Sequence, residues 1–509
     1  MKEAKESAEA VVQWTRAPKE RRGLTKLKGP NLLTKAVSKM RKSKEQQKKE
    51  SGIQLNIFSW IKQKPAHQPV DGINTEDEAG VELQSRLTKQ RALTENILNE
   101  IVAYGNLKRG YEQVRRNGGS SGIDEMDIAG LQEWLGQHIE ELRSALLKEE
   151  YKVSAVRKVE IPKPGGGMRM LGIPTVKDRL IQQAIQQELS RYYEPHFSEH
   201  SYGFRPGRNA QQAILRATDY IKEGNEWVVD IDLEKFFDKI NHDRLMQRLS
   251  KGIGDKRLLR LINAYLKAGM MESGIEQQRT AGTPQGSPLS PLLSNIVLDE
   301  LDRELEKRGH NFCRYADDCN IYVKSKKAGE RVMASVISFI EDKLKLKVNR
   351  EKSGVRHCSE VKFLGYTLLP DGGIRVADKS VDRLKEKVRE VTRRNRGVKF
   401  EQVVEELNAV TRGWTNYFGL ANKWLSTFTD MDAWIRRKLR CYKLKQCGKK
   451  YAIHKLLCKL GIAERSSWNV VMYSQGWWKM SSKVAVRQAM NTKWFVEQGL
   501  QSLSVRMQA

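Results

Sequence analysis

The sequence predicts an α+β protein of several domains, in which short strand pairs are combined with many helices. Two strand-like segments, residues 227–231 and 311–314, precede carboxylates, and the first is apolar. Elsewhere Leu, Ile and Val recur at the three- and four-residue spacing of amphipathic helices. From residue 376 onward the pattern is helical and basic. At 509 residues the chain is too long for one hydrophobic core, so several domains are expected.

The charge of the chain favours a polyanionic partner. Lys and Arg number 91 against 62 Asp and Glu, which gives a formal net charge of +29 and a pI near 9.7. A surplus of this size attracts nucleic acid, and an anionic membrane surface is the alternative. The sequence contains no run of about 18 apolar residues, so no membrane span is predicted. The N-terminus lacks the apolar core of a secretion signal.

The six cysteines indicate a reducing compartment. They lack Cys-x-x-Cys spacing, which favours free thiols over a disulfide framework or a zinc site. We therefore expect a cytoplasmic protein, with association with the nucleoid as a further option.

The N-terminal third begins with a basic extension. Residues 1–85 are polar and rich in Lys and Arg, which suits a phosphate-gripping arm as well as a solvated tail. Residues 65–80 within it are typical of a linker, and a helical region follows. Residues 153–173 predict two strands around a glycine-rich turn flanked by Lys163 and Arg169. These two side chains would converge on a phosphate group, although an ordinary hairpin turn has the same pattern.

Two loops and a strand end supply further candidates. Residues 201–209 form a tight aromatic loop with Arg205 and Arg208, placed before a helix whose N-terminus would favour a phosphate. The strand at 227–231 ends in Asp230 and Asp232, which share one face. Phe236 and Phe237 follow and would form a floor beneath a sugar. A Gly- and Pro-rich loop at 281–291 presents the amide of Gln285.

The segment 314–319, Arg-Tyr-Ala-Asp-Asp-Cys, predicts a hairpin turn that carries Asp317 and Asp318. Two adjacent carboxylates suit a hard divalent cation such as Mg²⁺. An isolated Asp-Asp pair is more often a solvated turn, so its meaning depends on the other motifs.

These motifs occur in one order, and in that order the chain resembles a reverse transcriptase of the group II intron-encoded reverse transcriptase/maturase family. The resemblance implies a right-hand polymerase, whose fingers and palm contain antiparallel sheet, followed by an α-helical thumb or maturase domain. It divides the chain into a basic N-terminal extension (1–85), a helical N-terminal reverse transcriptase region (86–150), fingers and palm (151–375), thumb or maturase domain (376–450) and a DNA-binding-like tail (451–509).

The resemblance also implies roles for particular residues. The catalytic carboxylates would be Asp232, Asp317 and Asp318, with Asp232 preferred to Asp230 because Asp232 begins the family's Asp-Leu-x-x-Phe-Phe pattern; a structure should decide between them. These three and the backbone carbonyl of Ile231 would bind two Mg²⁺ ions, with Mn²⁺ as a substitute. The substrate-binding set implied for the deoxynucleoside triphosphate is Lys163, Arg169, Phe236, Gln285 and Lys352.

The implied partners are intron RNA, an RNA template and target DNA, and a homodimer is compatible with the sequence. The RNA-binding set is Arg205, Arg208, Arg412, Arg436, Arg437 and Lys438. Trp414, Tyr417 and Trp434 are read first as helix-packing residues. No paired cysteines follow the thumb, so we expect no endonuclease domain of the His-Asn-His type.

Three other functions remain as alternatives. The first is a reverse transcriptase with another role, such as phage defence or diversity generation. The second is an RNA-binding splicing factor without polymerase activity, against which the three carboxylates argue. The third is a basic scaffold without enzyme activity, which would leave the ordered motifs unexplained.

Overall fold

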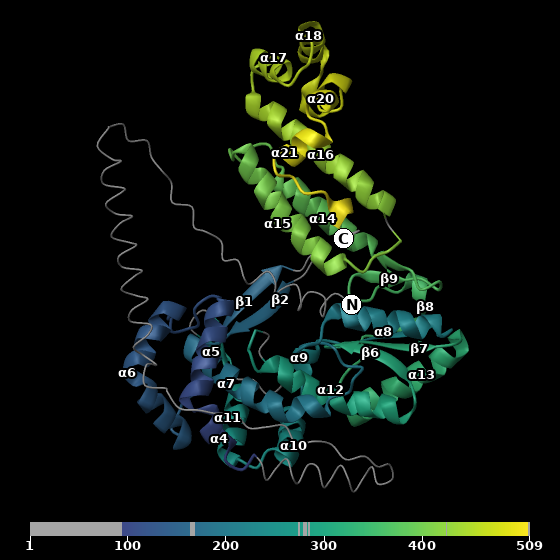
Figure 1. Ribbon diagram of the computed structural model, residues 1–509. Coiled ribbons are helices and arrows are strands. Elements are labelled where there is room, and N and C mark those ends of the chain that lie inside the picture. Colours follow the sequence, from purple (N-terminus) through teal and green to yellow (C-terminus); the bar gives the residue numbers. More distant parts are fainter. Residues whose placement is uncertain are drawn as a thin grey trace.

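The computed structural model describes residues 94–162, 168–272, 275–277, 282–283, 286–423 and 425–506. A broad lower body contains the larger sheets, and a narrow column of helices, from α14 onward, stands on it (Figure 1). The predicted α+β class is confirmed. The predicted extension at 1–85, with its linker, lies outside the described residues.

Three helices open the described chain and pack near a fourth. Their bounds are Ile97–Ile101 for α4, Tyr104–Asn117 for α5, Ile128–Leu147 for α6 and Val176–Tyr193 for α7. α6 and α7 begin at side-chain caps, because Asp127 accepts from Gly130 N and Thr175 accepts from Asp178 N. Their buried Leu, Ile and Val residues belong to the core that also supports the central sheet.

A first sheet contains the predicted strand pair. β1 (Val156–Pro162) and β2 (Met168–Ile173) are antiparallel, and β4 (Met270–Glu272) and β5 (Ile275–Gln277) extend the sheet in the order β2-β1-β4-β5. The turn between β1 and β2, at 163–167, lies outside the described residues.

The second sheet is fully antiparallel and holds the motif strands in its centre. Its order is β6 (Asn311–Tyr315), β7 (Asp318–Val323), β3 (Trp227–Asp232) and β8 (Gly354–His357). Because side chains alternate along a strand, the two faces of this sheet enter different cores. The face of Val229 and Ile231 belongs to the first core, and the face of Val228 belongs to a second.

Helices cover both faces of this sheet. α12 (Ser290–Lys307) and α13 (Lys326–Ser338) contribute to the first core, and α13 continues into the π-helical turn Phe339–Lys343. α8 (Ala210–Lys222) contributes to the second core and begins at a capping box in which Asn209 and Gln212 each accept from the other's backbone N–H.

The second core continues from the sheet into the column. It passes through the two-stranded sheet of β9 (Tyr366–Leu368) and β10 (Ile374–Val376) to the C-terminal helices. The bounds of those helices are Asp378–Val391 for α14, Phe400–Phe418 for α15, Leu425–Cys447 for α16, Lys450–Lys459 for α17, Glu464–Tyr473 for α18, Gly476–Met480 for α19, Val484–Ala489 for α20, Thr492–Glu497 for α21 and Leu503–Arg506 for α22. The boundary expected at 375/376 falls inside β10, and that at 450/451 falls at the start of α17. In the described part of the chain, no helix is long and apolar enough to cross a membrane.

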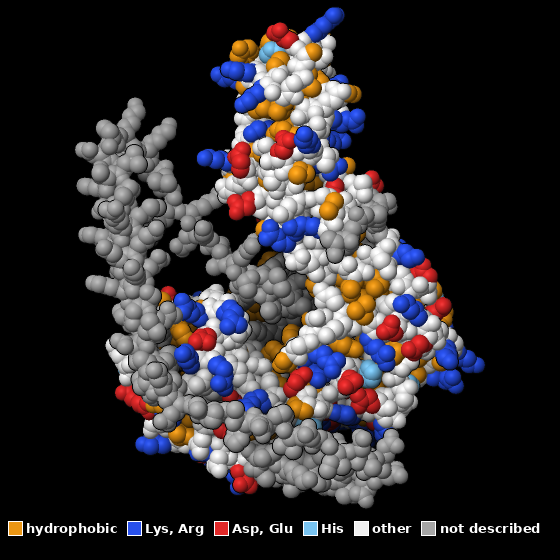
Figure 2. Space-filling view, viewed as in Figure 1, with side chains coloured by type: hydrophobic (Ala, Val, Ile, Leu, Met, Phe, Trp, Pro, Cys, Tyr) orange, Lys and Arg blue, Asp and Glu red, His pale blue; other side chains and the backbone are white. Residues whose placement is uncertain are grey.

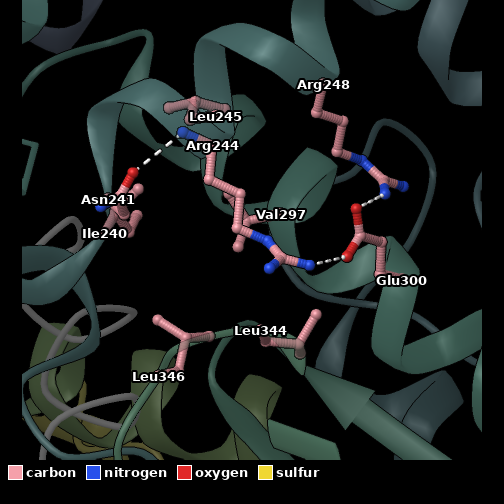
Figure 3. A pocket seen from close by; sticks show the side chains of 9 residues that line it. All are labelled: Ile240, Asn241, Arg244, Leu245, Arg248, Val297, Glu300, Leu344 and Leu346. Atoms are coloured by element: carbon pink, nitrogen blue, oxygen red, sulfur yellow. Dashed lines mark hydrogen bonds and ion pairs between the residues drawn. The ribbon is translucent and has the colours of Figure 1, made fainter. Parts of the chain in front are cut away.

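Three shorter helices complete the lower body, namely α9 (Phe236–Lys239), α10 (His242–Gly252) and α11 (Lys256–Lys267). Ion pairs join α10 to α12. Figure 3 shows Arg244 and Arg248 both reaching Glu300, with Leu344 and Leu346 lining the same hollow. Arg248 Nη2 also lies 2.9 Å from Asp299 Oδ2.

The two neighbouring carboxylates of α12 differ in acidity. Burial raises the pKa of Asp299 to about 6, and this effect outweighs the opposing attraction of Arg248 and Arg303. Burial also acts on Glu300, but there Arg248 and Arg244 prevail and hold the pKa below its usual value.

We expect Asp299→Asn to remove part of the pH dependence of stability. The pKa of Asp299 is about 6 in the folded chain and near 4 in an unfolded one, so the folded chain binds the extra proton between these values. This contribution to stability is fully present below pH 4 and is lost as the pH rises through 6. Between pH 7.5 and 4.5 the unfolding free energy of the wild type should rise by about 1–3 kcal/mol relative to the Asn variant.

Denaturant titrations of both proteins at the two pH values measure this difference. Asp243→Asn, at an exposed acid of α10, is the control and should show a smaller change. An equal gap between wild type and Asp299→Asn at both pH values would contradict the prediction.

Candidate active site

The β6–β7 connection is a two-residue turn that carries Asp317. Tyr315 pairs with Asp318, so Ala316 and Asp317 form the turn and Asp318 begins β7. Ala316 has a φ of 58°, in the left-handed region where glycine is usually found. Asp317 and Asp318 are only 6% and 5% exposed. This burial distinguishes the pair from an ordinary solvated turn.

β3 brings a third carboxylate beside this turn. Asp232 is the cross-strand partner of Asp318, and such partners hold their Cβ atoms about 4.5–5.5 Å apart on one face. Asp230 lies opposite Asn320, and its Oδ2 accepts from Arg356 Nη1 at 3.2 Å. The structure therefore brings Asp232, rather than Asp230, next to Asp318.

The segment after α13 fixes the end of β3. Asn349 N donates to the carbonyl of Asp232 at 2.8 Å, and Asp232 N donates to Ser353 Oγ at 2.9 Å. Lys352 Nζ lies 3.3 Å from Asp232 Oδ2, so this predicted substrate-binding residue is next to a predicted catalytic one. The side chain of Ile231 is a buried hydrocarbon without a donor atom, so only its backbone carbonyl is a candidate ligand.

The donor set of this site suits a hard divalent cation. Its chemistry is that of carboxylate oxygens, which Mg²⁺ and Mn²⁺ prefer. Among the described residues, no group of three or more His, Cys, Asp and Glu side chains lies close enough to hold a metal ion by itself. Mg²⁺ commonly takes one or two carboxylates and completes its shell with waters and substrate phosphates. An open set of three carboxylates at a strand end fits that mode of binding.

The elements after β3 line the same end of the sheet. Phe236 is 2% exposed and meets Phe237 edge to face, with ring centroids 5.3 Å apart. Phe236 is therefore packed in the interior beneath this end of the sheet. Thr283 N donates to the carbonyl of Phe237 at 2.7 Å, so the loop that contains Gln285 begins above α9. Gln285 itself lies outside the described residues.

The fingers candidates are only partly described. Lys163 lies outside the described residues, and of Arg169 only the backbone is described, opposite Ile161 in the β1–β2 pair.

The two arginines of the 201–209 loop have different surroundings. The side chain of Arg205 is 4% exposed; its Nε donates to Glu194 at 2.7 Å, and its Nη1 donates to the carbonyls of Ser198 and Ser201. Its donors are thus engaged within the protein, and the predicted contact of Arg205 with RNA stays a prediction that this burial does not favour. Arg208 is partly exposed and lies over the ring of Tyr202 at 5.6 Å.

The basic candidates of the column lie on two helices. Arg412 is exposed on α15, and Arg436 is half-buried on α16. The guanidinium of Arg437 lies 3.9 Å from the ring centre of Trp478, and Lys438 Nζ lies 5.2 Å from the same ring. Burial, together with nearby arginines, lowers the pKa of Lys438. Lys and Arg side chains are spread along the face of the column seen in Figure 2.

Aromatic residues of the column divide between packing and surface. Trp414 packs against Phe418 at 4.7 Å between ring centroids, and Tyr417 Oη donates to the carbonyl of Leu364 at 3.0 Å. Both residues therefore pack against other parts of the protein, as predicted from the sequence. Trp434 is partly buried and lies 5.5 Å from Lys438 Nζ.

The sequence analysis did not identify the buried ion pair next to the Asp317–Asp318 turn. Arg314 is 0% exposed and is paired with Asp302, which is also fully buried. The available signal was an arginine directly after the apolar residues 312–313 of the expected strand, since a buried arginine requires buried partners. Asp302 lies on α12, and no local pattern connects it to β6.

Two parts of the chain match known families. Residues 161–368 match the family described as reverse transcriptase (RNA-dependent DNA polymerase), and residues 381–459 match the group II intron, maturase-specific domain. The two matches cover the palm sheet and the first helices of the column.

Individual proteins are also similar to this chain. Protein YkfC of Escherichia coli (strain K12) is 33% identical over 287 residues, which are 49% of this chain and 75% of that protein. The group II intron-encoded protein LtrA of Lactococcus lactis subsp. cremoris is 30% identical over 326 residues, covering 51% of this chain and 54% of LtrA. One chain of the solved partial Cas6-RT-Cas1–Cas2 complex is 25% identical to this chain. The match covers 48% of this chain and 42% of the chain in the complex. Its TM-score is 0.32, too low to support an argument.

We expect Gly203→Ala to disturb the Asp317–Asp318 turn. A Cβ at Gly203 would lie 2.2 Å from Ala316 N, which neither backbone can accommodate without moving. The affinity for Mn²⁺, measured by electron paramagnetic resonance of the free ion, should fall by about tenfold or more, equivalent to ~1.4 kcal/mol.

Gly413→Ala is the matched control. At this helical position a Cβ meets nothing within 4 Å, so Mn²⁺ affinity should match the wild type. Unchanged Mn²⁺ affinity in Gly203→Ala would show that the close approach does not set the turn.

Proposed function

This chain belongs to the reverse transcriptase family, in the branch that joins the polymerase to a group II intron maturase domain, and we propose that it copies RNA into DNA and assists splicing of its parent intron. The observation that carries the polymerase half is the pairing of Asp232 with Asp318, next to Asp317. Two of these carboxylates lie on neighbouring strands and the third lies in the adjoining turn. We assign the primer end and the triphosphate to this end of the sheet.

Reverse transcriptases use divalent metal ions, and the residues of this site fit them. Two bound Mg²⁺ ions, or Mn²⁺ in their place, would stabilise the attacking and leaving oxygens of phosphoryl transfer. Asp232, Asp317 and Asp318, with the carbonyl of Ile231, are the groups that would hold these ions. The ladder of β3 and β7 fixes two of the carboxylates before substrate arrives, so little reorganisation is needed at the moment of reaction.

Other residues of the chain orient the nucleotide and neutralise its charge. Lys352, 3.3 Å from Asp232, adds positive charge beside the reacting phosphates and favours departure of pyrophosphate. Lys163 and Arg169 of the fingers hairpin bind the triphosphate. Phe236 forms the floor beneath the sugar and disfavours a 2′-hydroxyl, and we assign Gln285 to a contact with the sugar.

The maturase half is assigned to the column of helices. Arg412, Arg436, Arg437 and Lys438 lie on its helices, and Arg208 lies on the loop before α8. Arg437 is stacked on the half-exposed ring of Trp478. Such a pair can bind a backbone phosphate and an unpaired base at the same time. We assign the binding of intron RNA and of an RNA template to these surfaces. We assign the binding of target DNA to residues 451–509. The protein would act in the cytoplasm, where it can reach the nucleoid.

We expect Asp317→Asn and Asp318→Asn to abolish DNA synthesis while splicing assistance remains. Each change keeps the side-chain shape but removes a charge that the bound ions require. Extension of a primer on an RNA template should fall by about a thousandfold, since ~4 kcal/mol of transition-state stabilisation is lost.

Splicing of the parent intron RNA at low Mg²⁺ is the companion measurement and should stay near the wild-type level. Near-normal DNA synthesis by either variant would refute the site assignment. Loss of splicing together with synthesis would refute the separation of the two surfaces.

We expect Arg437→Gln with Lys438→Gln to weaken intron RNA binding and to reduce its salt dependence. Each lost phosphate contact lowers the slope of log K against log salt by about 0.7–0.9. Filter binding at several salt concentrations measures both quantities.

Lys326→Gln with Lys327→Gln removes the same charge from an exposed part of the palm and is the control. If the control variant loses as much affinity as the column variant, general charge rather than a defined surface binds the RNA.

A further inference from the structure

We propose that Arg314 is a positioning residue for the Asp317–Asp318 turn and that Asp302, Asn295 and Ser201 hold its guanidinium in the required orientation. The inference rests on the function proposed above, since it concerns how the same site is aimed. Arg314 acts through the backbone of the turn, without contact to substrate.

Arg314 uses every N–H of its side chain. Its Nε and Nη2 donate to the two oxygens of Asp302 at 2.7 and 2.5 Å. Its Nη1 donates to Asn295 Oδ1 at 3.1 Å and to the carbonyl of Ala316 at 2.9 Å. The second N–H of Nη2 donates to Ser201 Oγ at 2.7 Å. Because an arginine has five such donors, all are engaged and the guanidinium has a single favourable orientation.

The charge of Arg314 is balanced inside the protein. Both Arg314 and Asp302 are 0% exposed. Burial by itself lowers the pKa of Arg314, but the Asp302 carboxylate reverses this and raises it above its usual value. A buried ion pair of this kind adds little net stability. What it supplies here is a fixed direction for the bond to Ala316.

The turn depends on support from outside itself. Ala316 is left-handed at φ 58°, a conformation that surrounding structure must enforce on a residue other than glycine. Arg314 Nη1 donates a hydrogen bond directly to the carbonyl of this strained residue. The backbone of Arg314 is bonded on its other edge, since Arg314 N donates to His200 O and Tyr202 N donates to Arg314 O.

Arg314 supports the turn from the face opposite the carboxylates. It is the cross-strand partner of Cys319, whereas Asp318 is the partner of Tyr315. Successive side chains of a strand point to opposite faces, so Arg314 lies beneath the sheet and Asp318 above it. Asn295 also donates to the carbonyl of Gly203 at 2.9 Å, which ties Gly203, whose backbone packs against that of Ala316, into the same network.

The test compares Mn²⁺ binding with folding in two variants. Arg314→Lys keeps the charge but offers three donors on one atom, so it cannot serve five acceptor positions. Ser201→Ala removes one acceptor and leaves the ion pair intact. We expect Mn²⁺ affinity, measured by electron paramagnetic resonance without substrate, to fall about tenfold or more in Arg314→Lys and less in Ser201→Ala. The Mg²⁺ concentration for half-maximal DNA synthesis should rise in the same order, while the Kd for primer–template stays unchanged.

Arg440→Lys is the matched control for loss of buried arginine bonds. Arg440 is 8% exposed and donates to the carbonyls of Ser481 and Met490, far from the turn in the column. It should lower the midpoint of thermal unfolding without changing Mn²⁺ affinity.

The proposal is overturned if Arg314→Lys and Ser201→Ala lower the thermal midpoint but keep wild-type Mn²⁺ affinity, as Arg440→Lys should. If Arg314→Lys does not fold, Ser201→Ala decides by the same criterion. A wild type that binds Mn²⁺ in an Asp317-dependent manner but makes no DNA would refute the proposed function, while the Mn²⁺ titration would still decide the role of Arg314.

Discussion

The register between β3 and β7 is the constraint on which the site depends. It places Asp232 opposite Asp318 and leaves Asp230 opposite Asn320, beside Arg356. A slip of one residue would turn the carboxylates toward the core of Val229 and Ile231, where unpaired charge is costly. The apolar residues that alternate with the carboxylates therefore fix the position of the site as firmly as they stabilise the sheet.

Support for the turn comes from segments distant in the chain. The loop at 200–203 runs beside the end of β6, and α12 supplies both Asp302 and Asn295. Gly203 permits this approach because any side chain would meet the backbone of Ala316. A strained residue can persist at such a place because several independent contacts determine its conformation. The basic loop and the carboxylate turn are consequently one packed unit.

The second hydrophobic core links this unit to the column. It contains Val228 and Tyr322 of the sheet, Tyr366 of β9 and Phe418 of α15. Tyr417 Oη adds a hydrogen bond to the carbonyl of Leu364. Close-packed protein cores transmit strain rather than absorb it. The column surface that we propose to bind RNA is thus packed onto the polymerase sheet through one continuous core.

The sequence by itself determined the mixed fold class, the strand pairs and the carboxylate candidates, because periodicity and turn chemistry are local properties of the chain. Trp227 to Asp232 and the Asp317–Asp318 turn could be recognised in this way. Only tertiary structure could show that Asp232, rather than Asp230, lies opposite Asp318, because cross-strand register is a long-range property. Tertiary structure also determined that Arg205 is buried and which residues pair with Arg314. The burial of an arginine depends on which distant acceptors the fold brings to it. Local pattern could name the charged residues, but only packing could separate those that face a ligand from those that hold the site in place.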